Sequence, residues 1–230
     1  MSPLYLYAVL GAPPTAALGA GMLDEPLRLI DCAGVFAAAG ELRAPPALAP
    51  DVLRGHDAVV RRLAAATEAV LPARFGAMAA DDAELCEQLT RAGDGLREAL
   101  VRVAGREQMI LRVYSTTESL ATVDAPEPAV VSPDSGPGAR YLAERALAQR
   151  AAADVRELTP LRPVFDRFVV AERVERHDTR PLVASVYHLV ARGTGGAYSA
   201  AVDEAARELS DVRVTVSGPW AAYAFAPALG

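Results

Sequence analysis

Three histidines are the side chains of this sequence best suited to acid–base chemistry, because imidazole titrates near neutral pH without help from its surroundings. His56 falls on the apolar face of an expected helix, and Asp57 beside it points elsewhere. His177 lies at the tip of an expected hairpin, and His188 lies in the middle of an expected strand. None has a companion residue that would make it a general base. The sequence therefore predicts structural histidines and no catalytic residue.

A glycine-rich loop, Arg192-Gly193-Thr194-Gly195-Gly196, connects an expected strand with an expected helix. In that setting backbone amides can bind a phosphate. The loop lacks the Lys-Ser/Thr pair of a P-loop and the six-residue glycine fingerprint of dinucleotide sites. We therefore favour a plain strand-to-helix connection. The alternative function is a ferredoxin-like ligand-binding or phosphate-binding enzyme that uses Gly193 to Gly196.

Metal and thiol chemistry finds little support in the residue pattern. Cys32 and Cys86 occur in a chain without other signs of secretion, which favours two reduced, buried cysteines. Two thiols alone do not make a metal site, and Asp81-Asp82 is better explained as charge at a helix N-terminus. The sequence predicts no metal site and no cofactor.

Composition narrows the class of partner. The 230 residues carry a net charge of -6, which argues against nucleic acid as the main partner. A hydrophobic content of 52% excludes bulk disorder, and a length of 230 residues is enough for one large domain or two small ones. The uncharged N-terminal stretch lacks a basic region and is broken by Pro13-Pro14, and no later apolar run is long enough for a membrane span. We expect a cytoplasmic protein with no membrane partner.

The first half of the chain alternates apolar runs with turn residues, which predicts several strands and two helices. Asp51 is expected to cap the first helix, which should end near Leu71-Pro72, and Asp81 with Glu84 forms the capping box of the second. Gly105 should cap the end of that second helix. The expected strands are Leu4 to Leu10, Leu27 to Cys32, Val35 to Ala39 and Gln108 to Tyr114.

The second half begins after a segment rich in proline, glycine, serine and acids, which is typical of an exposed linker. A helix is expected from Ala139 to about Leu158, followed by a helical turn or edge segment over Val164 to Val170. We also expect a helix that carries Tyr198 and Val202 on one face. The predicted later strands are Arg173 to His177, Leu182 to Ala191 and Val212 to Val216, the last interrupted by Gly218-Pro219.

These elements predict an α+β protein of two small domains, since each half mixes a few strands with two helices. Residues 1–121 are expected to form an N-terminal ferredoxin-like α/β sandwich, and residues 122–138 the linker. Residues 139–230 are expected to form a modified ferredoxin-like α+β domain with an aromatic C-terminal tail.

Two segments look suited to binding another protein. The first is Leu71-Pro72-Ala73-Arg74-Phe75-Gly76, in which Arg74 and Phe75 point to opposite faces of an extended chain. The second is the tail, which must pack on its own domain or on a partner. The candidate interaction residues are Arg74, Phe75, Pro219, Trp220, Tyr223 and Phe225.

Read together, several motifs resemble the gas vesicle protein F/L family (GvpL/GvpF). They are the opening Leu4-Tyr5-Leu6-Tyr7, His56-Asp57 at the start of a helix, the Leu71 to Gly76 segment, and Gly218-Pro219-Trp220-Ala221-Ala222-Tyr223-Ala224-Phe225. The family's tail usually reads Gly-Pro-Trp-Pro-Pro-Tyr-x-Phe, so Ala221 and Ala222 replace two prolines here and leave the tail less stiff.

The resemblance implies an accessory or minor structural protein of gas vesicle assembly, with two α/β domains, no enzymatic activity and no cofactor. It also implies a gas-vesicle-associated location and a role in binding the hydrophobic main shell protein, with other gas vesicle accessory proteins as further partners. An apolar shell subunit needs a partner surface that is itself apolar and partly aromatic.

Overall fold

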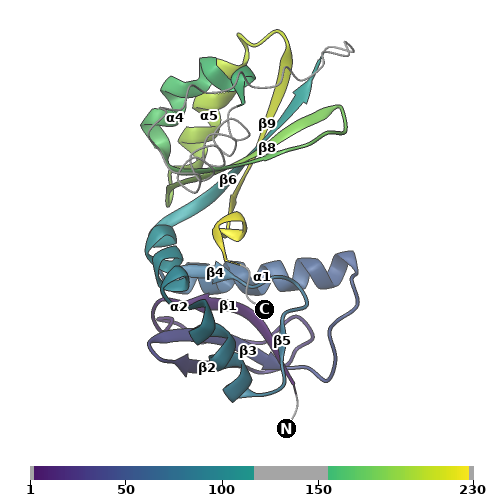
Figure 1. The fold of residues 1–230 in the computed structure, drawn as a ribbon, viewed down its shortest axis with the longest axis vertical. Coiled ribbons are helices and arrows are strands. Elements are labelled where there is room, and N and C mark those ends of the chain that lie inside the picture. Colours follow the sequence, from purple (N-terminus) through teal and green to yellow (C-terminus); the bar gives the residue numbers. More distant parts are fainter. Residues whose placement is uncertain (1–2, 117–154, 228–230) are drawn as a thin grey trace, which may run out of the picture. The chain divides into compact units, whose positions relative to one another are not determined.

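The computed structural model describes residues 3–116 and 155–227, which form two compact units. The first unit comprises residues 3–108, Leu189–Gly195 and 218–227, and the second unit comprises the other described residues. Each unit mixes helices with one sheet (Figure 1), so the predicted α+β class is confirmed. The expected linker 122–138 and most of the helix expected from Ala139 lie outside the described residues, and the domain boundary stays a prediction.

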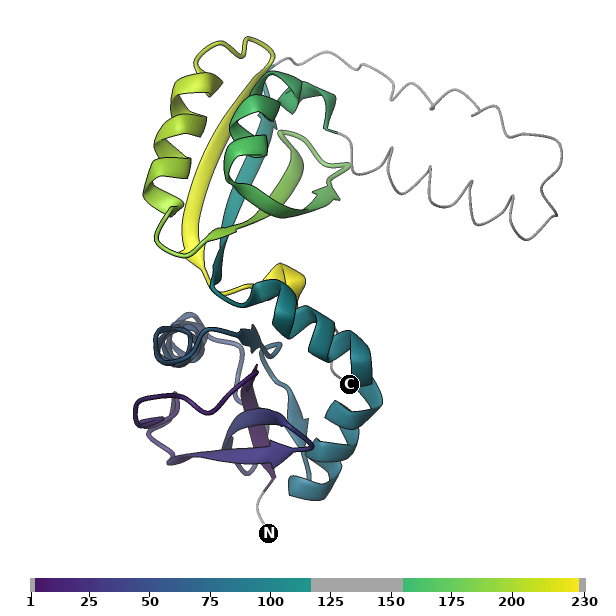
Figure 2. The ribbon, with the colours of Figure 1, turned by 90° about the vertical axis from the view of Figure 1, so that its left-hand side faces the viewer.

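The sheet of the first unit is built around β1. Its strand order is β2-β3-β1-β4, with β5 also paired with β1, and these pairings are antiparallel. Every residue of β1 is buried, because strands flank it on both sides and helices cover both faces of the sheet (Figure 2). The strands are β1 (Leu4–Leu10), β2 (Leu27–Cys32), β3 (Val35–Glu41), β4 (Val70–Pro72) and β5 (Met78–Ala79).

The helix α1 (Pro50–Ala66) buries the predicted stripe of His56, Val59, Val60 and Leu63. Both predicted ends of this helix are wrong. Its N-cap is Ala49 without a side-chain hydrogen bond, with proline in the first turn, so Asp51 is not the cap. It stops at Ala66 because Val70–Pro72 instead joins the sheet as β4, where Leu71 is paired with Val9 of β1. The apolar residues Val70–Pro72 also fit a helix, but their pairing with β1 places them in a strand.

The helix α2 (Asp82–Val103) begins as the sequence predicts. The carboxylate of Asp81 accepts a hydrogen bond from the backbone N–H of Glu84 at 2.9 Å, which is the N-cap interaction of a capping box. The helix ends before Gly105, whose φ of 66° suits a C-terminal glycine. Gly93 interrupts α2 with a non-helical φ of 49°, so the helix consists of two segments.

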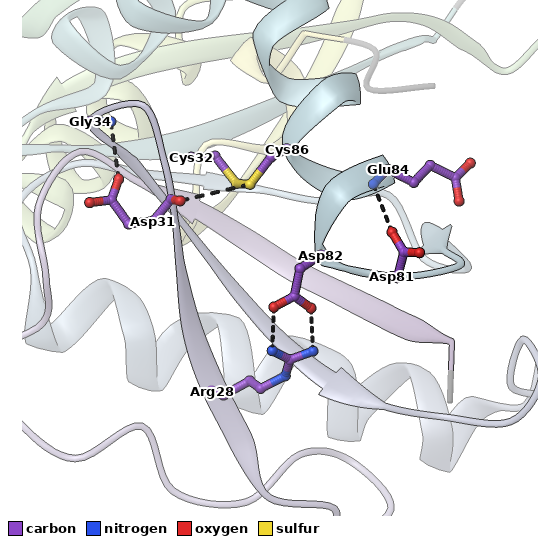
Figure 3. Close-up of a disulfide and its surroundings, with 8 residues drawn as sticks. All are labelled: Arg28, Asp31, Cys32, Gly34, Asp81, Asp82, Glu84 and Cys86. Atoms are coloured by element: carbon purple, nitrogen blue, oxygen red, sulfur yellow. Dashed lines mark hydrogen bonds and ion pairs between the residues drawn. A yellow bond between two sulfur atoms is a disulfide. The ribbon is translucent and has the colours of Figure 1, made fainter. Parts of the chain in front are cut away.

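A disulfide between Cys32 and Cys86 joins the end of β2 to the first segment of α2 (Figure 3). The prediction of two reduced thiols is therefore wrong. The two residues are separated by 54 positions in sequence, yet folding places their Cα atoms 5.0 Å apart, within the range a disulfide bridges. The Arg28–Asp82 ion pair makes a second connection between β2 and α2, with Arg28 Nη1 donating to Asp82 Oδ2 at 2.7 Å (Figure 3).

The second sheet has the strand order β7-β8-β6-β9, so β7 and β9 are its edges. Its helices α4 and α5 lie on one face of the sheet (Figures 1 and 2). Residues 164–170 supply both of the predicted alternatives, a helical turn and then an edge strand. The elements are β6 (Arg106–Ser115), the 3-10 helix η1 (Arg156–Leu161), α4 (Arg162–Phe168), β7 (Val169–Arg176), β8 (Leu182–Ala191), α5 (Gly195–Ala206), β9 (Val212–Trp220) and the 3-10 helix η2 (Tyr223–Phe225).

The ferredoxin-like topology expected for the first unit is not confirmed. A ferredoxin-like unit runs strand, helix, strand, strand, helix, strand. Here β1 is followed by a loop that leads directly into the β2–β3 hairpin, with no helix between β1 and β2 in the described residues 11–26. The final strand also differs from expectation, since β9 continues through Gly218-Pro219 to Trp220 as an edge strand, where a missing N–H is tolerated.

Candidate functional site

His56 is a core residue of the first unit. The residue is 3% exposed, and its Nδ1 atom lies 2.9 Å from the hydroxyl oxygen of Tyr5. Its ring stacks on Tyr7 and meets Phe75 edge-on, with ring centres 5.5 Å and 5.8 Å away. Burial lowers the pKa of His56, which keeps the imidazole neutral. The prediction of a hydrogen-bonded core histidine is confirmed.

Glu25 is a buried carboxylate that the sequence pattern does not reveal. The hydroxyl of Tyr7 donates to Glu25 Oε1, and the backbone N–H of Leu23 donates to Oε2 at 2.9 Å. Burial raises the pKa of Tyr7, and so does its hydrogen bond to Glu25, so the phenol remains a donor. In the sequence Glu25 stands between Asp24 and Pro26 and looks like an ordinary exposed loop residue. The network ties this loop to the sheet.

His188 forms the corresponding network in the second unit. Its Nδ1 atom lies 2.6 Å from the Tyr198 hydroxyl, and its Nε2 atom lies 2.8 Å from Glu172 Oε2. The acid–imidazole–phenol order resembles a proton relay, but Tyr198 and His188 are each 0% exposed, so neither is open to a reactant. His177 is bound to Ser185, with Nε2 and Oγ 2.9 Å apart. His56 and His188 are thus buried, hydrogen-bonded residues of their units.

The glycine-rich loop holds an anion from its own chain. The backbone N–H groups of Gly193 and Gly195 donate to Glu107 Oε1 at 3.2 Å and 3.1 Å, and the N–H of Thr194 donates to Ala191 O at 3.1 Å. The carboxylate of Glu107 therefore occupies the position that a phosphate would take. This arrangement removes the geometric support for the phosphate-binding alternative.

Arg74 and Phe75 lie in a short excursion between β4 and β5, the two strands that pair with one side of β1. Phe75 turns inward, with its ring centre 6.2 Å from that of Tyr5, whereas Arg74 is exposed. The backbone N–H of Gly76, which has a φ of 89°, donates to the Tyr5 hydroxyl at 3.3 Å. The prediction that one side chain faces the core and the other faces solvent is confirmed.

The aromatic tail packs on the first unit. The hydroxyl of Tyr223 donates to Asp57 Oδ1 at 3.4 Å, and the backbone N–H of Ala224 donates to the buried side chain of Gln108 at 2.8 Å. Burial, together with the nearby Asp57 carboxylate, raises the pKa of Tyr223. Trp220 and Phe225 are half-buried. The tail therefore packs on the unit that contains residues 3–108, and not on the C-terminal residues expected to form its own domain.

All six candidate interaction residues belong to the first unit. The helix η2 contacts β4, so the tail lies beside the strand that leads into Arg74 and Phe75. Among residues 3–116 and 155–227, no cluster of three or more histidine, cysteine or acidic side chains could hold a metal ion. No helix in that part of the chain combines the length and apolar character needed to cross a membrane.

Comparison with known proteins identifies the family. Residues 3–227 match the family described as "Gas vesicle synthesis protein GvpL/GvpF". The chain belongs to the GvpL/GvpF family. It is similar to gas vesicle protein L of Streptomyces sp. (strain CB03234), with 31% identity over 254 residues that cover 96% of this chain and 92% of the relative.

Solved structures of GvpF share the fold of this GvpL/GvpF chain. The protein GvpF from Anabaena sp. PCC7120 matches with a TM-score of 0.71 and 18% identity, covering 99% of this chain and 97% of that chain. GvpF from Microcystis aeruginosa matches with a TM-score of 0.71 and 17% identity, covering 99% and 100%. GvpL/GvpF is a family of gas vesicle synthesis proteins and not a known enzyme family.

Proposed function

We propose that this chain is a non-catalytic accessory protein of gas vesicle assembly that binds the hydrophobic main shell protein. The observation that carries the proposal is the family match over residues 3–227, joined to the placement of all six candidate residues on one unit. The side chains of His56, His188 and Glu107 could take part in catalysis, but each is hydrogen-bonded to other groups of the same chain. A cytoplasmic, vesicle-associated location and contacts with other gas vesicle accessory proteins follow from the same proposal.

Arg74 and Phe75 are the candidate contacts between β4 and β5. Arg74 is exposed at the edge of the first sheet, and Phe75 is half-buried beside it. An arginine next to an aromatic ring is a frequent energetic centre of protein interfaces. Trp220, Tyr223, Phe225 and Pro219 support this surface, because the tail lies on β4.

Capture of the purified main shell protein by the immobilised full chain tests the proposal. Arg74→Ala should weaken capture, whereas Arg91→Ala, an exposed arginine on α2, should leave it unchanged. No capture by the wild-type chain would contradict the proposal. Immunoblotting of washed vesicles separates a minor vesicle component from an assembly factor that leaves, and calorimetry with nucleotides and phosphorylated metabolites tests the enzyme alternative.

We also propose that the second unit is a ferredoxin-like domain. The support is the element order β6, α4, β7, β8, α5, β9 together with the strand order β7-β8-β6-β9. Both helices lie on one face of the sheet, as that architecture requires (Figure 2).

A further inference from the structure

The first unit carries two adjoining pockets. The larger has a volume of about 680 Å³ and is bounded by the ends of β1 and α1, the β2–β3 turn and the last turns of α2. The smaller has a volume of about 270 Å³ and is bounded by α1, the start of β6 and the tail from Pro219. Ala65, Glu68 and Arg192 line both pockets. The two form one continuous surface feature, here called the Arg192 groove.

The larger part of the Arg192 groove is mostly apolar. Its wall is built from alanine, valine, leucine, proline and glycine, with two threonines, and charge is supplied by Glu68, Arg97 and Arg192. Val101 lies at the edge of this pocket and is 75% exposed, a fraction exceeded among the large apolar residues of the described ranges only by Leu48. A pocket of about 300–1,000 Å³ with apolar walls and few polar groups is typical of a binding site.

The smaller part of the groove is cationic. The guanidinium of Arg106 donates to the backbone carbonyl of Arg102, and that of Arg192 donates to the carbonyls of Thr67 and Glu68 at 3.2 Å and 3.3 Å. Within the described ranges neither guanidinium is paired with a carboxylate.

The acidic side chains of this part do not cancel that charge fully. Of the two glutamates that line it, Glu107 is engaged by the loop amides, and Glu68 lies on the exposed rim. The third arginine, Arg61, is already paired with Asp57 at 2.9 Å. A chain with a net charge of -6 thus presents, next to an apolar surface, two arginines that have no carboxylate partner among the described residues.

We propose that the Arg192 groove binds an apolar peptide segment that carries one carboxylate, presented by the shell protein. The larger, apolar pocket binds the hydrophobic side chains of the peptide, which contact Val101 at its edge. The carboxylate binds Arg106 and Arg192, whose forked donors match its geometry and fix the register of the segment. The identity of the partner rests on the proposed function, and the chemistry of the bound segment rests on the groove alone.

A pair of labelled peptides tests the groove directly. Each is an apolar helical sequence of about 15 residues, roughly four turns, and the two differ only in carrying one glutamate or one glutamine. Fluorescence anisotropy with the full chain should give tighter binding of the glutamate peptide by about fivefold, and added salt should reduce this preference. Arg106→Gln should abolish the preference while leaving the glutamine peptide unaffected.

The apolar part has its own matched variants. Val101→Gln should weaken binding of both peptides by about tenfold, because it removes exposed apolar contact area without adding charge. Val170→Gln, at a valine that is 55% exposed in the second unit, should change neither affinity. Both sites are exposed, so the variants should fold. Equal binding of the two peptides by the wild type, or unchanged binding by Val101→Gln, would overturn the inference.

Experiments with the shell protein distinguish a failure of the groove from a failure of the proposed function. Capture of the shell protein that Val101→Gln leaves undiminished would overturn the groove as the docking site while the proposed function stands. Binding of the glutamate peptide by a wild-type chain that fails to capture the shell protein would support the groove and contradict the proposed function.

Discussion

Opening the Cys32–Cys86 disulfide should destabilise the first unit by a measurable and calculable amount. The bond closes a loop of 54 positions in sequence. The chain-entropy relation for a loop of that length gives about 4 kcal/mol of lost stability when the bond is reduced, and measured disulfides usually contribute about 2–4 kcal/mol. The neighbouring Arg28–Asp82 pair cannot compensate, because its side chains are 41% and 43% exposed and exposed pairs contribute at most about 1 kcal/mol.

Urea unfolding with and without a dithiol reductant measures this contribution. Trp220 is the only tryptophan of the chain and belongs to the first unit, so its fluorescence reports on the unit that contains the disulfide. With a slope of about 2 kcal/mol/M, reduction should lower the urea midpoint by about 1–2 M. Thiol alkylation followed by mass measurement verifies the state of the bond in each sample.

Because Gly93 divides α2 into two segments, the loss of stability on reduction should be concentrated in the segment that contains Cys86. Hydrogen exchange should accelerate on reduction in residues 82–92 of α2, which the disulfide attaches to β2, and much less in residues 94–103. The Cys32→Ala, Cys86→Ala double variant is the control, since its midpoint should not respond to the reductant. An unchanged midpoint in protein whose alkylation proves that the bond is open would refute the loop-entropy reasoning, and two free thiols in unreduced protein would refute the bond.

Three further predictions concern the internal networks. The hydrogen bond from His188 lowers the pKa of Glu172 below its usual 4.5. The stability that this contact contributes is therefore present above pH 4.5 and is lost as the pH falls through the lowered pKa. When unfolding is measured as a function of pH, Glu172→Gln should lose less stability in acid than the wild type does. Glu107→Ala leaves two loop amides open, which should cost about 1–3 kcal/mol and let sulfate raise the thermal midpoint of the variant but not of the wild type. Gln108→Leu removes the acceptor for the backbone N–H of Ala224, so proteolysis within residues 218–227 should accelerate while the free energy of unfolding falls by less than about 3 kcal/mol; a tail that stays equally protected would contradict a role of this hydrogen bond in holding it.

The amino-acid sequence determined the features that depend on neighbours along the chain. The run of β1, the β2–β3 hairpin and the capping box of α2 follow from side-chain alternation, turn residues and caps. These features are local, and their free energies depend on residues only a few positions apart.

Only the tertiary structure decided what occurs between distant residues. It converted two expected thiols into the Cys32–Cys86 disulfide, and it ended α1 at Ala66 by pairing Val70–Pro72 with β1. It also filled the glycine-rich loop with Glu107, a residue 86 and 88 positions away from the two donors. No local pattern encodes such contacts, because burial, strand pairing and charge satisfaction are settled by which surfaces meet when the chain is folded.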